Sequence, residues 1–317
     1  MKQSLSDYCR GFANANAPWP ALPLAEPPSM AWWRALLAET DGVSLFDRLR
    51  ESLPQLCMPQ RPGVSQSEEY RHAVLRGLPL HTSLGAEMPG LLAPEQLRLE
   101  IAAHFAVTLP VLRTSDREDF LFLTRALAHR CEPVPIAAGV HAQAVGGLIH
   151  WGLIRVHGRE TRAQLILLHE APYGSVPADR VPGRPSAAHW LALSGVLRLE
   201  HELTHLATKA LCGEMRLNLL DELIADAMGM LRALGTFSAD LFRRCLGVEE
   251  DGSAPAHARV WTYVAELEQS DALTAIQLAL ERAQELEALF KSSRLPTDPV
   301  QRLRWLCQQR LCSRWRD

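Results

Sequence analysis

Apolar residues recur three and four positions apart from residue 187 to the end of the chain, and this spacing predicts a run of helices. One helix is expected over 187–211 and another over 214–234. Gly213 and Gly235 follow the last apolar positions of these segments, and a glycine there is typical of a helix end. The second half of the chain is therefore predicted to be helical.

The first third of the chain shows helical spacing too, interrupted by proline-rich joints such as 17–29. Segment 94–109 begins with a proline that suits the first turn of a helix, so we expect a helix there. Ser115 and Glu118 form a capping-box pattern, which predicts that a further helix begins there and runs over 117–130.

The strongest β signal lies in the middle of the chain. Residues 139–157 are rich in Val, Ile, Gly and Trp, residues 157–162 form a polar turn, and residues 163–171 are a second apolar run. We expect these two runs to form a β-hairpin, in which Gly146 and Gly147 favour a bulge or a close backbone approach.

Together these patterns predict an α+β protein that is mainly α-helical. We expect a helical N-terminal region over 1–134, a central core over 135–235 and a helical C-terminal region over 236–317 that packs on the core.

Composition excludes several classes of protein. Apolar residues make up 47% of 317 residues, which is enough for a large core, and the net charge is −3 with acids and bases interspersed. No basic stripe suggests a nucleic-acid partner. The seven cysteines are scattered without a C-x-x-C pair, so no disulfide framework or cysteine zinc site is indicated.

The chain also lacks the usual membrane and export signals. The weakly polar run 135–156 contains two histidines and Arg155, which a membrane span would have to bury in lipid. The first residues lack the apolar stretch of a cleavable signal peptide, so we expect a cytoplasmic protein, with export independent of such a signal left open.

Candidate chemistry centres on the sequence HELTH at 201–205. His201 and His205 are four residues apart, so they lie about 40° apart on one helix face, where both imidazoles can bind one Zn²⁺. Glu202 is offset by one residue, beside the metal, where its carboxylate can act as a base.

The next predicted helix offers further ligands. Glu222 and Asp226 are also four apart, and if the chain folds back near Gly213, one register faces Glu222 with His205 and Asp226 with His201. Glu222 then becomes the third ligand of a single zinc ion, and Asp226 accepts the outer N–H of His201. The alternative is a pair of solvated helix faces that never meet.

H-E-x-x-H at 201–205 followed by E-x-x-x-D at 222–226 resembles the gluzincin group of zinc metallopeptidases, which includes the thermolysin-like enzymes. The resemblance implies a zincin-like core, with the hairpin before the H-E-x-x-H helix and one hairpin strand aligning a peptide substrate. It assigns His201, His205 and Glu222 as ligands, Glu202 as general base and Asp226 as support for the first histidine. Arg198 departs from the extended motif, which is usually uncharged at that position.

The resemblance implies hydrolysis of a peptide bond in a peptide or protein substrate, by zinc-bound water that Glu202 activates. A further donor normally stabilises the oxyanion. Histidines and tyrosines near the motif are the candidates: His169, Tyr173, His189, His257 and Tyr263. Two alternatives stay open, namely a zinc amide hydrolase acting on a small or modified molecule, and a non-catalytic helical interaction protein with a structural metal.

Overall fold

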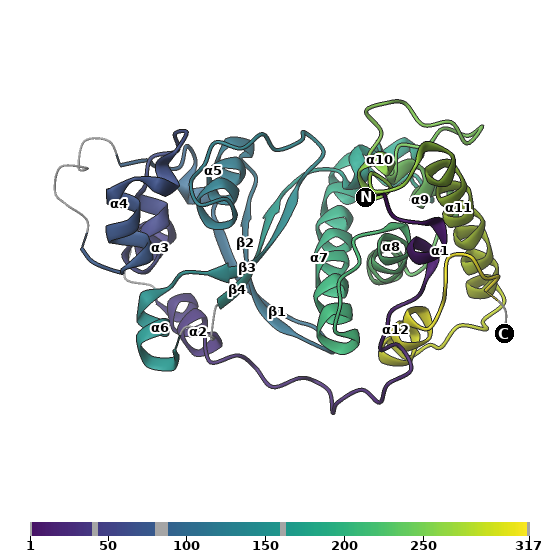
Figure 1. The fold of residues 1–317 in the computed structure, drawn as a ribbon, viewed down its shortest axis with the longest axis horizontal. Coiled ribbons are helices and arrows are strands. Elements are labelled where there is room, and N and C mark those ends of the chain that lie inside the picture. The colour runs from purple at the N-terminus through teal and green to yellow at the C-terminus, as the bar shows by residue number, and fades with distance from the viewer. Residues whose placement is uncertain (1, 40–43, 80–87, 159–162, 316–317) are drawn as a thin grey trace. The chain divides into compact units, whose positions relative to one another are not determined.

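The computed structural model describes residues 2–39, 44–79, 88–158 and 163–315, and it shows an α+β fold that is mainly helical (Figure 1). The predicted fold class is confirmed. The chain forms two compact units: a sheet unit, Ala25–Glu170, and a helical unit, which combines Met1–Leu24 with Ala171–Asp317. The predicted boundaries of the three sequence segments stay a prediction.

The sheet unit contains one four-stranded sheet in the order β1-β2-β4-β3. Its strands are β1 (Arg98–Ala103), β2 (Thr108–Thr114), β3 (Ala142–Leu148) and β4 (Ala163–His169). β1 pairs antiparallel with β2, β2 pairs parallel with β4, and β3 pairs antiparallel with β4.

Short helices accompany the sheet. The α-helices of this unit are α2 (Met30–Ala38), α3 (Leu45–Ser52), α4 (Glu68–Tyr70), α5 (Arg117–Ala128) and α6 (Trp151–His157). Single turns of 3₁₀ or π helix lie at Pro54–Cys57, Val64–Gln66, Arg71–Leu75 and Pro94–Gln96. Trp33, Leu49, Phe120 and Leu167 are fully buried in the core that these elements share.

The predicted helix over 94–109 is wrong. Only a 3₁₀ turn, Pro94–Gln96, begins at the proline, and the segment continues with β1, a short turn over 104–107 and the start of β2. Ile101 pairs with Pro110 and Ala102 with Leu109 across the two strands. Sheet pairing thus overrides the local helical spacing, which is a weak determinant in a short segment.

The predicted hairpin is correct in its pairing and wrong in its connection. β3 and β4 are antiparallel neighbours, and the register shifts between Val145 and Leu148, at the two glycines. However, the chain forms the helix α6 after β3 and before β4, and His150 is the N-cap of that helix. Residues 159–162 of the predicted polar turn lie outside the described residues.

The helical unit contains α1 (Leu5–Cys9), α7 (Ala187–Cys212), α8 (Leu219–Leu234), α9 (Ala239–Cys245), α10 (Val260–Tyr263), α11 (Gln269–Lys291) and α12 (Pro299–Cys307). Two 3₁₀ turns, Tyr173–Ser175 and Ala178–Arg180, precede α7. The chain doubles back after α7, so that α8 packs along it within this unit (Figure 1). In the part of the chain that the structure describes, no helix is long and apolar enough to cross a membrane.

Candidate metal centre

The helix α7 presents the two histidines of the sequence motif. It begins after Ser186, whose hydroxyl accepts a hydrogen bond from the His189 N–H at 3.2 Å, and it ends at Gly213 in the left-handed conformation (φ 79°). His201 and His205 are one turn apart and buried, with ring centroids 4.6 Å apart. A long, well-capped helix therefore holds both imidazoles on one face.

The helix α8 presents the acids. It begins after Asn218, whose side-chain oxygen accepts a hydrogen bond from the Asp221 N–H at 3.1 Å. Glu222 and Asp226 are both buried on this helix. The fold-back brings each of the predicted pairs together: Glu222 with His205, and Asp226 with His201.

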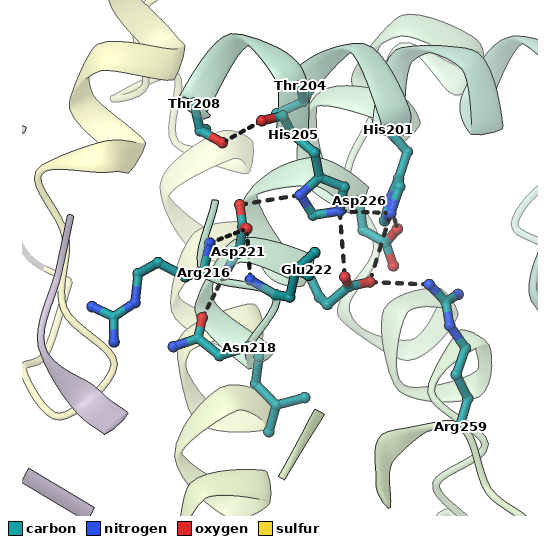
Figure 2. Close-up of polar contacts among 12 residues, drawn as sticks. His201, Thr204, His205, Thr208, Arg216, Asn218, Asp221, Glu222, Asp226 and Arg259 are labelled. Carbon is teal, nitrogen blue, oxygen red and sulfur yellow. Dashed lines mark hydrogen bonds and ion pairs between the residues drawn. The ribbon is translucent and has the colours of Figure 1, made fainter. Parts of the chain in front are cut away.

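His201, His205 and Glu222 form a buried group that could hold a metal ion, since one ligand atom of each lies within 4.8 Å of the others. Glu222 Oε1 is 3.3 Å from His205 Nε2, and Glu222 Oε2 is 3.6 Å from His201 Nε2. The two Nε2 atoms are 3.0 Å apart. Figure 2 shows the Glu222 carboxylate facing both rings.

The Nδ1 atoms of both rings face other carboxylates. His201 Nδ1 is 2.7 Å from Asp226 Oδ1, and His205 Nδ1 is 3.2 Å from Asp221 Oδ1 (Figure 2). A carboxylate at Nδ1 favours the tautomer with its proton there. In that tautomer the Nε2 atom of each ring carries a lone pair, and both Nε2 atoms lie next to the Glu222 carboxylate.

These distances and donors fit a zinc ion. Zinc bonds of about 2.0–2.1 Å in a tetrahedron place neighbouring ligand atoms roughly 3.3 Å apart, close to the separations found here. Two Nε2 lone pairs facing each other at 3.0 Å repel unless a proton or a metal cation lies between them. Two imidazoles and a carboxylate are also a common catalytic zinc set.

The electrostatics of the site are strongly coupled. Burial alone would raise the pKa of Glu222, but the hydrogen bond from His205 and the charges of His201, His205 and Arg259 outweigh it and hold that pKa well below its usual range. Burial would lower the pKa of His205, but Asp221 and Glu222 raise it well above its ordinary value. The carboxylates around the triad therefore favour positive charge at its centre.

Arg259 and Tyr263, from the segment at α10, complete the surroundings of Glu222. An Arg259 Nη atom is 3.0 Å from Glu222 Oε2 (Figure 2). The guanidinium also lies over the Tyr263 ring, 5.3 Å from its centroid. Burial and the nearby Glu222 carboxylate, to which the hydroxyl donates, raise the pKa of Tyr263 well above its ordinary value. A cation and a neutral hydroxyl thus flank the third residue of the triad.

The remaining predicted residues differ in position. Glu202 is half-buried on α7, and none of the described residues forms a hydrogen bond or ion pair with its carboxylate. His257 and His189 are exposed, and His189 lies at the beginning of α7, twelve residues before His201. His169 belongs to the sheet unit, where its ring stacks on His141.

Tyr173 lies behind the first histidine. Its hydroxyl is 2.8 Å from His201 Nδ1 and donates to Asp226 Oδ1. It thus contacts the ring on the side away from Glu222, which differs from the position of an oxyanion donor.

Sequence reasoning missed Asp221 and Arg259. Asp221 directly precedes Glu222, and the same helix register that pairs Glu222 with His205 could have indicated it. Arg259 is 37 residues beyond Glu222 in the chain, and no local pattern connects the two residues. Only the packing of the helical unit brings this guanidinium to the acid.

No curated protein and no solved structure matches the chain significantly. One protein family matches it, over residues 5–164 and 159–313, which together cover nearly all of the sequence. The chain therefore belongs to this family, which is described as a family of unknown function (DUF7005).

Proposed function

We propose that the protein is a zinc-dependent metallopeptidase. The observation that carries this proposal is the buried His201, His205 and Glu222 group, whose ligand atoms lie within 4.8 Å of one another. The H-E-x-x-H and E-x-x-x-D motifs that supply these residues resemble those of gluzincin peptidases. Among the described residues the group offers three protein ligands, the number typical of a catalytic site, whereas a structural zinc site usually has four.

When bound, a zinc ion would supply an acidified water and would polarise the substrate carbonyl. Glu202 lies on the same helix as both histidines and is free to act as the base, since no described residue engages its carboxylate. In this mechanism Glu202 accepts a proton from the attacking water as the C–O bond forms. It then delivers that proton to the amide nitrogen as the C–N bond breaks.

Other residues would position the metal and stabilise charge. Asp226 and Asp221 hold the Nδ1 sides of His201 and His205. Arg259 and Tyr263 both contact Glu222 and are our candidates for stabilising the oxyanion.

The direct test combines metal content with catalysis. We expect the purified protein to hold one zinc per chain and the His205→Ala variant to lose it. Peptide mixtures incubated with the zinc-loaded protein are then analysed by mass spectrometry for new cleavage products. The Glu202→Gln variant should keep its zinc and lose activity by roughly 10²–10⁴-fold, as expected for a general base.

The outcomes separate the competing functions. Protein without zinc would contradict the proposal. A zinc-loaded protein that cleaves small amides and leaves peptides intact would favour the zinc amide hydrolase. Unchanged biological activity of Glu202→Gln would favour a helical interaction protein with a structural metal.

A further inference from the structure

The segment around Tyr173, before α7, is hydrogen-bonded to the face of α7 that carries His201. Ser194 Oγ accepts a hydrogen bond from the Tyr173 N–H at 2.9 Å. Arg198 donates to the carbonyl oxygens of Ala171 and Pro172, at 2.9 and 3.3 Å. Ser194, Arg198 and His201 follow one another at spacings of four and three, so they lie along one face of α7.

This attachment fixes the Tyr173 side chain beside His201. The Arg198 guanidinium lies over the Tyr173 ring at 5.6 Å, and both residues are buried. The next residue, Gly174, has φ 58°, and a Cβ there would lie 2.8 Å from the backbone of Cys245. The chain therefore passes between α7 and α9 by a route that only glycine permits without displacement.

The Tyr173 hydroxyl completes a triangle of three polar atoms. It donates its proton to Asp226 Oδ1, so its oxygen can only accept from His201 Nδ1, 2.8 Å away. His201 Nδ1 is also 2.7 Å from Asp226 Oδ1, an acceptor. Neither oxygen has a second proton to offer, so Nδ1 must carry the proton that it shares with both.

We propose that Tyr173 is a positioning residue that fixes the orientation and tautomer of His201, and that Arg198 acts through Tyr173. This inference rests on the proposed function, because it assigns His201 Nε2 to the metal. Arg198 is buried, and it is the residue that departs from the extended zincin motif. The inference assigns a role to it. Its guanidinium binds the carbonyl oxygens of Ala171 and Pro172, the two residues directly before Tyr173.

The test compares zinc affinity in Tyr173→Phe and in wild type, measured by competition with a chromophoric chelator. We expect the affinity to fall by about 10–100-fold, the usual effect of removing a hydrogen-bonding partner of a ligating histidine. Tyr70→Phe is the matched control, since Tyr70 is a buried tyrosine of the sheet unit. Loss of its hydroxyl should leave zinc affinity unchanged. Cobalt-loaded protein provides a spectroscopic signature, because an altered imidazole orientation shifts the visible absorption bands.

A double-variant cycle tests the role of Arg198. If Arg198 acts through Tyr173, then Arg198→Met combined with Tyr173→Phe should weaken zinc binding no more than the stronger of the single changes. Additive losses would overturn that part of the inference. If Arg198→Met fails to fold, Arg198→Lys, which keeps the charge and loses the two-carbonyl geometry, replaces it.

Metal-free protein gives an independent reading. In ¹⁵N spectra of labelled histidine, wild-type His201 should be protonated at Nδ1. Exchange of that proton with water should be faster in Tyr173→Phe, because the hydroxyl no longer accepts from it. Absence of zinc from wild type would contradict the proposed function. The ¹⁵N measurement would still test whether the Tyr173 hydroxyl and Asp226 hold the proton on His201 Nδ1. Wild type that binds zinc, with Tyr173→Phe equal to it in affinity and proton exchange, would overturn only the present inference.

Discussion

Each of the two histidines on α7 faces an acid of α8 at its Nδ1 atom, but the two acids are held differently. Asp226 faces His201 and also accepts from Tyr173. Asp221 faces His205 and accepts hydrogen bonds from the backbone N–H groups of Arg216 and Leu217 at 2.9 and 3.0 Å. The orientation of each ring is therefore decided by a different set of neighbours.

Asp221→Asn tests this arrangement at the scale of one residue. The amide keeps the shape of the side chain but loses its charge, so the proton on His205 Nδ1 is held less firmly and Nε2 is a poorer ligand. We expect zinc affinity to fall by about 10–100-fold.

Asp119→Asn is the matched control for that change. Asp119 is likewise buried and accepts from two backbone N–H groups, those of Leu92 and Ala93, but it belongs to the sheet unit. We expect this variant to lose stability and to retain zinc affinity. Equal zinc affinities in both variants and wild type would contradict the role given to Asp221.

At the scale of elements, the site depends on the close approach of α7 and α8. Gly229 on α8 lies against α7, where a Cβ would stand 2.8 Å from the carbonyl oxygen of Leu197. A larger residue at this position would push the helices apart and separate the imidazoles from Glu222. Glycine at position 229 therefore allows the two helices to pack closely, although glycine is unfavourable in a helix interior.

Gly229→Ala should therefore destabilise the protein, although alanine favours a helix interior by about 0.5–1 kcal/mol. We expect a loss of about 1–3 kcal/mol, typical of overpacking, measured by urea unfolding. Gly146→Ala serves as control, because a Cβ there would meet nothing within 4 Å. A stabilised Gly229→Ala variant would show that the helices can separate without cost.

Elements also differ in how far the sequence predicts them. The helix α7 has complete local signals, because Ser186 and Gly213 cap it where its apolar spacing begins and ends. The helix α8 ends at Gly235 as predicted, but it begins at Leu219, after the Asn218 cap, and not at the predicted residue 214. The segment over 94–109 lacks such agreement. Its spacing fits a helix, but β1 and β2 pair with each other across the short turn 104–107, and β2 has a second partner, β4, that is distant in sequence.

At the scale of the whole molecule, a bound metal should stabilise one unit more than the other. All residues of the candidate centre belong to the helical unit, Met1–Leu24 with Ala171–Asp317. A ligand that binds only the folded state stabilises it by about 4 kcal/mol at a thousand times its dissociation constant.

Removing zinc by chelation should therefore raise amide hydrogen exchange in α7, α8 and the segment around Arg259. The strands β1, β2 and β4 of the sheet unit should keep their protection, as followed by mass spectrometry of peptides from each unit. Treatment of the His205→Ala variant with the same chelator is the control and should change neither unit. Equal loss of protection in both units on chelation would contradict a centre confined to the helical unit.

The sequence by itself determined α7, the end of α8 and, on the condition that the chain folds back near Gly213, the register that pairs His201 with Asp226 and His205 with Glu222. These features follow from helical periodicity and caps, which act between residues close in the chain. Tertiary structure alone decided the parallel pairing of β2 with β4 and the placement of Tyr173 and Arg259 beside the triad. Those contacts join segments separated by many residues, and they form only when the packing of each unit brings the segments together.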